Sequence, residues 1–242
     1  MLVTPARFAS MWHVAAPESY IEWINTHLGF NPRAQKNSDA LSDFVVADLR
    51  ANCPALDRAF ENGVLVSRKN VDVRTNVVER NVDLVVQNTG ALPDVLFSIA
   101  VEHKTIMTAH GKARKNRYGD IIAYSNHIHN HWQACIAGAI VVMNSSLAYE
   151  NPDAFAQRLI RPQFKMARIV QATTAIFAGI PLRDAPDDPS DQPEALSVIV
   201  IDYDGVNAAT LVTDERAPQP EHSIYYDRFI SRICALYERR QR

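Results

Sequence analysis

Short apolar runs alternate along this chain with longer amphipathic segments and with clusters of Asn, Gly and Pro. Apolar runs of this length, bounded by such clusters, are typical of β-strands. The pattern predicts strands at 64–66, 71–78, 82–86, 95–101, 137–143 and 197–201. The first two would be separated by a turn at Arg68-Lys69-Asn70. The nearly unbroken apolar runs of the fourth and fifth indicate strands buried on both faces.

The amphipathic segments predict helices at about 17–28, 41–61, 112–132, 153–178 and 223–240. Because proline lacks the backbone N–H that a helix interior needs, we expect a break at Pro54 and another at Pro162. Residues 181–194 contain four prolines and four aspartates, which predicts a solvated loop that does not pack. This order of elements favours an α/β fold, in which a central mixed β-sheet is flanked by helices. We expect one domain over 1–242, with a core at about 41–144 and a C-terminal elaboration at about 150–242.

The composition narrows the class of protein. An apolar fraction of 47% with 21% charged residues is ordinary for a globular chain, and the net charge of −2 means that any nucleic-acid surface must be local. The three cysteines are widely spaced, which suits a reducing cytoplasm better than a disulfide framework. The N-terminus lacks the unbroken apolar segment of a signal peptide, and the longest apolar run, 134–143, is too short to cross a bilayer. We therefore expect a soluble cytoplasmic protein with no membrane partner.

Two of the predicted strands each carry an acid within apolar surroundings. Asp83 interrupts Val82-Asp83-Leu84-Val85-Val86, and Glu102 follows Ala100-Val101. A charge in an apolar strand requires a partner, and two carboxylates on adjacent strands are enough protein ligands for Mg²⁺, which usually keeps several waters. The alternative interpretation is structural, with both acids at strand ends and paired with Arg74 or Arg80.

The residues around Glu102 complete a candidate catalytic group. Side chains alternate along a strand, so Glu102 and Lys104 would share a face while His103 points to the other. Lys104 would then orient or polarise an attacking water, and the backbone carbonyl of His103 would be a third metal ligand. This combination indicates metal-dependent cleavage of a phosphodiester.

A basic segment with no acid between Glu102 and Asp120 follows this group directly. Cations at a helix N-terminus oppose the helix dipole, so a phosphate partner explains them better than solvent does. The candidate DNA-binding residues are His110, Lys112, Arg114, Lys115 and Arg117. Their alternative interpretation is a solvated start of a helix.

The chain resembles the PD-(D/E)XK nuclease superfamily, whose fold is restriction-endonuclease-like. Asp83 matches the first acid of the motif, with Val82 where its proline would be, and Glu102-His103-Lys104 matches the (D/E)-X-K. The order of one helix, three strands, a helix and a strand over 41–144 fits as well. Some members place Gln and Tyr four residues apart on the following helix. Asp120 and Tyr124 have that spacing and are candidate residues of the cleft lining, together with His127.

This resemblance implies a Mg²⁺-dependent endonuclease, for which Mn²⁺ substitutes, that leaves 5′-phosphates on double-stranded DNA. It also implies an extra acid, for which Glu79 and Glu61 are candidates, and a homodimer acting on a palindromic site. A type II enzyme of prokaryotic restriction or other anti-phage defence is the leading subclass, since no phosphate-binding ATPase motif is present. The alternatives are a modification-dependent or non-specific defence nuclease and a non-catalytic DNA-binding protein with a decayed site.

Three histidines at 127, 129 and 131 lie close together in the helix predicted at 112–132. A zinc site would need further ligands at matching spacing, so polar packing is the better interpretation of this group. His127 also has the spacing from Tyr124 to face a cleft.

Overall fold

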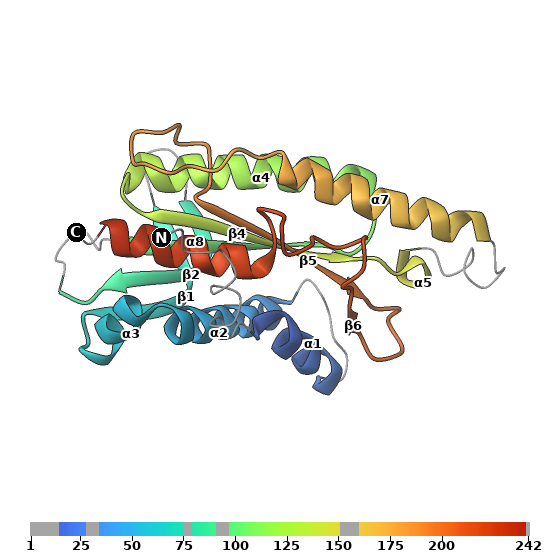
Figure 1. Ribbon diagram of the computed structural model, residues 1–242, viewed down its shortest axis with the longest axis horizontal. Coiled ribbons are helices and arrows are strands. Elements are labelled where there is room, and N and C mark those ends of the chain that lie inside the picture. Colours follow the sequence, from blue (N-terminus) through green and yellow to red (C-terminus); the bar gives the residue numbers. More distant parts are fainter. Residues whose placement is uncertain (1–14, 28–33, 75–78, 91–96, 151–159, 241–242) are drawn as a thin grey trace, which may run out of the picture.

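The strands form one six-stranded sheet, ordered β1-β2-β3-β4-β5-β6, in a computed structural model that describes residues 15–27, 34–74, 79–90, 97–150 and 160–240 (Figure 1). The strands are β1 (Leu65–Arg74), β2 (Glu79–Asn88), β3 (Phe97–Ile106), β4 (Ile136–Asn144), β5 (Ala195–Asp202) and β6 (Thr210–Leu211). The first three pair antiparallel, β3 to β5 pair parallel, and β6 is antiparallel to β5. The prediction of a mixed sheet in an α/β fold is confirmed.

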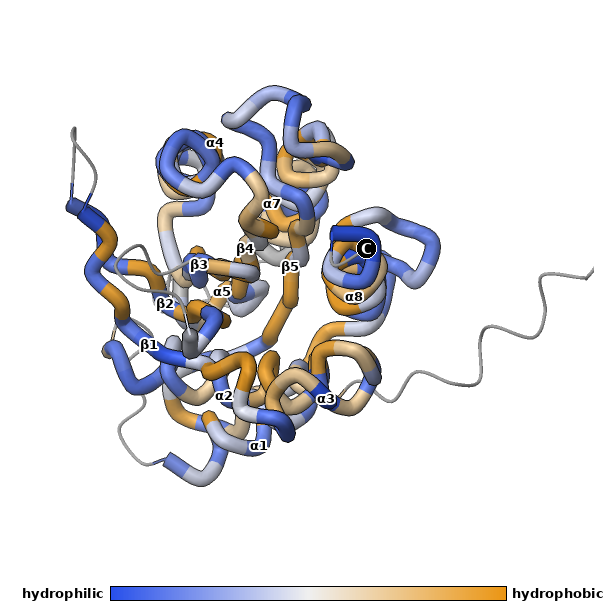
Figure 2. Tube along the Cα trace, turned by 90° about the vertical axis from the view of Figure 1, so that its left-hand side faces the viewer, coloured by the Kyte–Doolittle hydropathy of each residue, from blue (hydrophilic) through white to orange (hydrophobic). Residues whose placement is uncertain are grey.

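Helices cover both faces of this sheet. The helices are α1 (Ala16–Thr26), α2 (Gln35–Asn52), α3 (Pro54–Glu61), α4 (His110–His131), α5 (Leu147–Glu150), α7 (Ile160–Ala178) and α8 (Tyr226–Arg240). Figure 1 shows α4 and α7 side by side on one face, with α1, α2 and α3 on the other. α8 packs on the same side as α2, against β4 and β5. Figure 2 shows the apolar segments turned inward between these layers.

Side chains alternate along β4, so successive residues pack against the helices on opposite faces of the sheet. Ile140 and Val142 pack in the cluster that contains the buried faces of α1, α2 and α8. Val141 and Met143 pack in the cluster under α4 and α7. Every residue of β4 is buried, as expected for a central parallel strand with helices on both sides.

The predicted turn at Arg68-Lys69-Asn70 is instead a distortion inside one continuous strand. Lys69 pairs with Leu84 and Val71 with Val82, so the register is the same on both sides of Asn70. Asn70 itself has a left-handed backbone, with φ of 54°, and its side chain donates to Asp39 of α2 at 2.6 Å. Asparagine tolerates this conformation better than most residues, which explains the turn-like composition of a segment that remains in the sheet.

Pro54 and Pro162, the two prolines predicted to break helices, differ in their effect on the backbone. α2 ends at Asn52 and α3 begins at Pro54, so the predicted break is confirmed, although α2 starts earlier than expected, at Gln35. α7 runs from Ile160 through Pro162 without a break, so the interruption predicted there is wrong. Proline is tolerated near the start of a helix because the first N–H groups have no partner within the helix. The part of this prediction that covers 153–159 lies outside the described residues.

The acidic loop at 181–194 has no helix or strand, as predicted, but it does pack against the fold. Its Arg183 is 1% exposed and donates to the carbonyl of Gln133 at 3.0 Å. Glu194 is fully buried and accepts hydrogen bonds from His129, from the backbone N–H of Ala137 and from Arg240 at 2.8 Å each. The expectation of a wholly solvated loop is therefore wrong. Buried charged side chains lie near both of its ends, and they are paired with residues that include members of α4 and α8.

No helix in the described part of the chain is both long and apolar enough to cross a bilayer.

Candidate active site

The strands β2 and β3 separate where the two predicted acids lie. The last pair of their ladder is Leu84 with Val101, which are the direct neighbours of Asp83 on β2 and of Glu102 on β3. In place of a further ladder bond, the backbone N–H of His103 donates to Oδ2 of Asp83 at 2.8 Å. Asp83 also lies opposite the left-handed Asn70 of β1, where no ladder pair forms. The carboxylate therefore occupies a fork in the sheet.

Glu102 and Lys104 share a face of β3, as the alternation of side chains predicts. Lys104 Nζ donates to Oε1 of Glu102, and Nη2 of Arg80 lies 3.7 Å from the same oxygen. Glu102 is 2% exposed, and its second oxygen, Oε2, makes no hydrogen bond to the described residues. Burial raises the pKa of Glu102, and the nearby Lys104 only partly offsets this effect. The pairing with Arg80 that the structural interpretation proposed is thus present, together with the lysine contact.

His103 points to the opposite face, as predicted, toward α2. Its Nδ1 lies 3.1 Å from Oγ of Ser38, which also donates to Oδ1 of Asp83 at 2.6 Å. Burial lowers the pKa of His103 and favours the neutral ring. Because the N–H and the carbonyl of a strand residue point to the same neighbouring strand, the carbonyl of His103 also points toward β2, on the side of Asp83.

A pocket of about 340 Å³ opens beside this fork. Asp83, His103, Lys104 and Arg117 contribute its charged or ionisable side chains, and Ser38 lies at the start of α2. The remaining wall comes from Tyr20, Ala34, Gln35, Asn37, Leu41, Thr105 and Val142. Glu102 does not line it, because its carboxylate lies behind Lys104 among the buried residues under α4.

The predicted DNA-binding residues differ in exposure and in their partners. Lys112 and Lys115 are exposed on the first turns of α4. Arg117 reaches back to the pocket, where its Nη1 donates to Asp120 at 2.7 Å and its Nε to the carbonyl of Thr105 at 3.3 Å. Arg114 is half-buried. The remaining residue, His110, is 1% exposed, and its Nε2 donates to the backbone carbonyl of Asn144 at 2.7 Å, so its side chain is held inside the protein.

The residues predicted to line a cleft all belong to α4, and two of them lie on its buried side instead. Tyr124 is fully buried, with the guanidinium of Arg80 5.7 Å from its ring centre, and burial raises its pKa well above the usual value. His127 is 8% exposed, and burial lowers its pKa. Asp120 is half-buried and pairs with Arg117. Arg80 connects this group to the acids, since it also donates to the carbonyl of Asp120 at 3.3 Å.

Neither candidate for the extra acid is close to the fork. Glu79 is exposed at the first residue of β2, four residues from Asp83, which is about 13 Å along a strand. Glu61 is exposed at the last residue of α3. Ser38, by contrast, contacts both Asp83 and His103 but is not singled out by the sequence. The only signal for it is a polar spacing, with Ser38 and Ser42 one helical turn apart on the inner side of α2.

The remaining histidines have structural partners. Both ring nitrogens of His129 face oxygen acceptors, the carbonyl of Ser190 and Oε2 of Glu194, at 2.8 Å each. His131 is exposed and packs edge-on against Trp132. Within the described ranges, no group of three or more His, Cys, Asp or Glu side chains has the arrangement of a metal site. Polar packing is therefore the better interpretation for this group.

Magnesium needs fewer than three protein ligands. It is commonly held by one or two carboxylates and keeps its waters otherwise. Asp83 accepts two hydrogen bonds of the roughly four that a carboxylate offers, which leaves acceptor capacity for an ion. Oε2 of Glu102 is a buried oxygen without a partner among the described residues. The two acids fit the hard-oxygen donor set of Mg²⁺, with Asp83 already facing the pocket.

A second pocket of about 380 Å³ lies between α1, β5 and α8 and does not include these residues. Its acids, Glu18 and Asp227, occupy the first turns of α1 and α8, where the helix dipole favours acids, although burial and the nearby Glu18 raise the pKa of Asp227. A helix N-terminus is an ordinary position for an acid, so the fork remains the candidate site. Comparison of the chain with protein-family models and with curated proteins finds no significant match.

Proposed function

We propose that this protein is a Mg²⁺-dependent DNA endonuclease of the type II restriction class. The observation that carries the proposal is the hydrogen bond from the N–H of His103 to Asp83, which joins the strand of one acid to the Glu102-His103-Lys104 segment of the other. The order of α2, three antiparallel strands, α4 and a parallel β4 supports the resemblance to the PD-(D/E)XK superfamily.

Each residue at the fork has a distinct role in this proposal. Asp83 and Glu102 would bind Mg²⁺, with the carbonyl of His103 as a third ligand; Mn²⁺ would substitute. When bound, the ion would lower the pKa of a coordinated water and neutralise charge on the phosphoryl oxygens. Lys104, whose side chain is 19% exposed at the pocket wall, would orient the attacking water or balance developing charge.

The DNA backbone would approach from the start of α4. Lys112 and Lys115 are exposed there, and Arg117 extends the positive charge to the pocket. Phosphate contacts of this kind position the duplex without reading its sequence. A homodimer would place one such site on each strand of a palindromic target.

Digestion of a supercoiled plasmid of known sequence tests the proposal. We expect Mg²⁺-dependent cleavage into discrete fragments with 5′-phosphate ends, and a smear would instead indicate a non-specific effector nuclease. Asp83→Asn, Glu102→Gln and Lys104→Met should each abolish cleavage and retain DNA binding in a gel-shift assay. Full cleavage by any of the three would remove that residue from the site.

One observation favours a non-catalytic DNA-binding protein as a second candidate. Glu102 is buried behind Lys104 and does not reach the pocket. If this pairing persists when DNA and Mg²⁺ are present, the protein would bind DNA without cutting it. Binding that is identical with Mg²⁺ and with a chelator, in the absence of any cleavage, would support this candidate over the nuclease.

A further inference from the structure

Ser38 connects the candidate metal ligand Asp83 to the ring of His103. Its hydroxyl oxygen lies 2.6 Å from Oδ1 of Asp83 and 3.1 Å from Nδ1 of His103. The same Asp83 accepts the backbone N–H of His103 through its other oxygen. One oxygen of the carboxylate is therefore held by α2 and the other by the backbone of β3.

The direction of these hydrogen bonds follows from their donors and acceptors. An ionised carboxylate only accepts, so the single proton of the Ser38 hydroxyl is donated to Asp83. The Ser38 oxygen must then accept from His103, which places the ring proton on Nδ1. The chain of donors thus runs from His103 Nδ1 to Ser38 and from Ser38 to Asp83.

We propose that Ser38 and the His103 ring are positioning residues that set the affinity of Asp83 for a divalent cation. This inference rests on the proposed function and adds to it a regulating group on the face opposite Glu102 and Lys104. Neither side chain touches the reacting atoms. They fix the rotation of the carboxylate at the edge of the pocket, so that its remaining acceptor positions are available to the ion.

Partners of this kind around a metal-binding carboxylate commonly change metal affinity by about 10- to 100-fold when they are removed. Ser38 is half-buried and belongs to the first turn of an 18-residue helix. A change in its hydroxyl therefore need not disturb the core packing of α2, which begins at Leu41 and Val45.

A matched pair of variants isolates the hydroxyl. Threonine and valine are both β-branched and nearly equal in volume, but only threonine donates a hydrogen bond. Ser42 provides a control on the same helix, because its hydroxyl reaches the backbone carbonyl of Asp83, at 3.4 Å, and not the carboxylate. The variants are Ser38→Thr, Ser38→Val and Ser42→Ala in the full chain.

The measurement is Mn²⁺ binding without DNA. Binding is monitored through the electron paramagnetic resonance signal of free Mn²⁺. We expect Ser38→Val to weaken binding by about 10-fold or more, while Ser38→Thr and Ser42→Ala stay near the original affinity. Thermal midpoints of all three variants, measured in parallel, separate this effect from unfolding. Equal Mn²⁺ affinity for Ser38→Val and Ser38→Thr would overturn the inference, even if the protein cleaves DNA. Two other results would each overturn the inference together with the metal site of the proposed function: the original protein binds no Mn²⁺, or Asp83→Asn binds Mn²⁺ as tightly as the original protein does.

Discussion

The backbone N–H of His103 donates to Oδ2 of Asp83 at 2.8 Å, just beyond the last ladder pair between β2 and β3. A side chain on one strand thereby satisfies a backbone donor on the next, where the strands have begun to separate. The carboxylate closes the fork and faces the pocket at the same time. Loss of Asp83 should therefore affect stability as well as cleavage.

Asp83→Ala should lower the free energy of unfolding by about 1–3 kcal/mol, because the N–H of His103 and the hydroxyl of Ser38 lose their acceptor. Asp83→Asn should cost less, since its carbonyl oxygen still accepts one of these bonds. Urea denaturation of both variants measures the difference. Equal stability of Asp83→Ala and the original protein would show that the fork does not depend on this carboxylate.

Glu102→Gln should make the protein more stable at neutral and alkaline pH. Burial raises the folded-state pKa of Glu102, so ionisation lowers stability as the pH rises through that pKa. A neutral glutamine avoids this loss, and the two proteins should converge below the ordinary carboxyl range. Each kcal/mol would appear as about 2–4 °C in the thermal midpoint, measured from about pH 4 to about pH 8. A gain in stability that is the same at every pH would contradict this explanation.

Lys112→Ala combined with Lys115→Ala should weaken DNA binding without abolishing cleavage at low salt. If each lysine contacts one phosphate, the slope of log K against log salt should fall by about 2. The matched control is Arg58→Ala with Arg239→Ala, which removes two exposed cations from α3 and α8. An unchanged salt slope in the α4 variant would place the DNA elsewhere on the surface.

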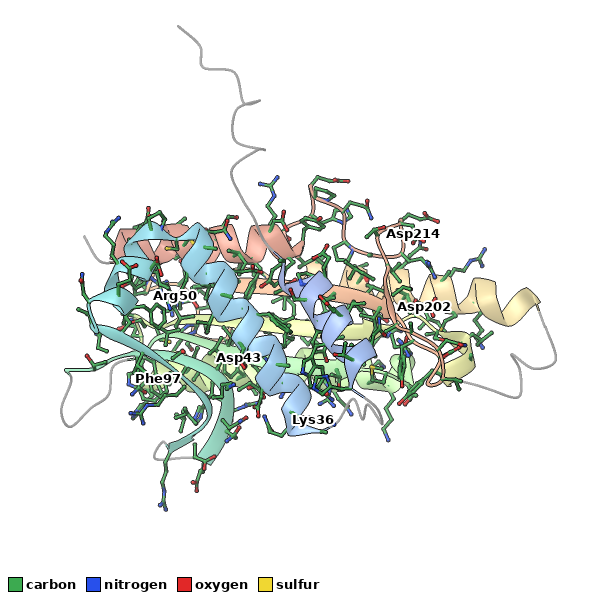
Figure 3. All side chains as sticks on the ribbon, turned by 90° about the horizontal axis from the view of Figure 1, so that it is seen from below. Lys36, Asp43, Arg50, Phe97, Asp202 and Asp214 are labelled. Carbon is green, nitrogen blue, oxygen red and sulfur yellow. The ribbon has the colours of Figure 1, made fainter. Side chains whose placement is uncertain are left out.

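A charged surface on α2, visible in Figure 3, tests whether DNA binds at the start of α4 alone. Lys36, Asp43 and Arg50 follow one another along α2, seven residues apart and all exposed. Asp43 accepts from Lys69 of β1 at 2.7 Å, so this face carries charges of both signs. We expect Arg50→Ala to leave DNA affinity unchanged in the same titration, whereas a loss equal to that of the α4 variant would extend the DNA surface across α2.

Glu194→Leu should destabilise the fold by about 3–5 kcal/mol, because it leaves the buried Arg183 without its charged partner. Asp184→Ala is the control, since it removes an exposed partner of Arg232 on the same loop and should cost at most about 1 kcal/mol. Urea denaturation compares the two. Similar losses would mean that the loop at 181–194 contributes little through its buried network.

Much of the fold is predictable from local pattern. The apolar runs predicted five of the six strands in the described part of the chain and the burial of β4, and Pro54 marked the boundary between α2 and α3. The exceptions depend on contacts that are distant in sequence. Asn70 stays in a strand because Asp39 of α2 holds its side chain, and the acidic loop packs because Glu194 meets Arg183, His129 and Arg240.

The same distinction applies to the site. By itself, the sequence determined that two acids interrupt apolar strands, that Lys104 shares a face with Glu102, and that His103 points the other way, because these relations follow from the period of a strand. Only the tertiary structure decided that the strands separate at those acids, that Glu102 is buried behind Lys104, and that Ser38 from α2 supports Asp83. Those relations arise where helices and strands remote in sequence pack together, and no local periodicity records which side chains meet there.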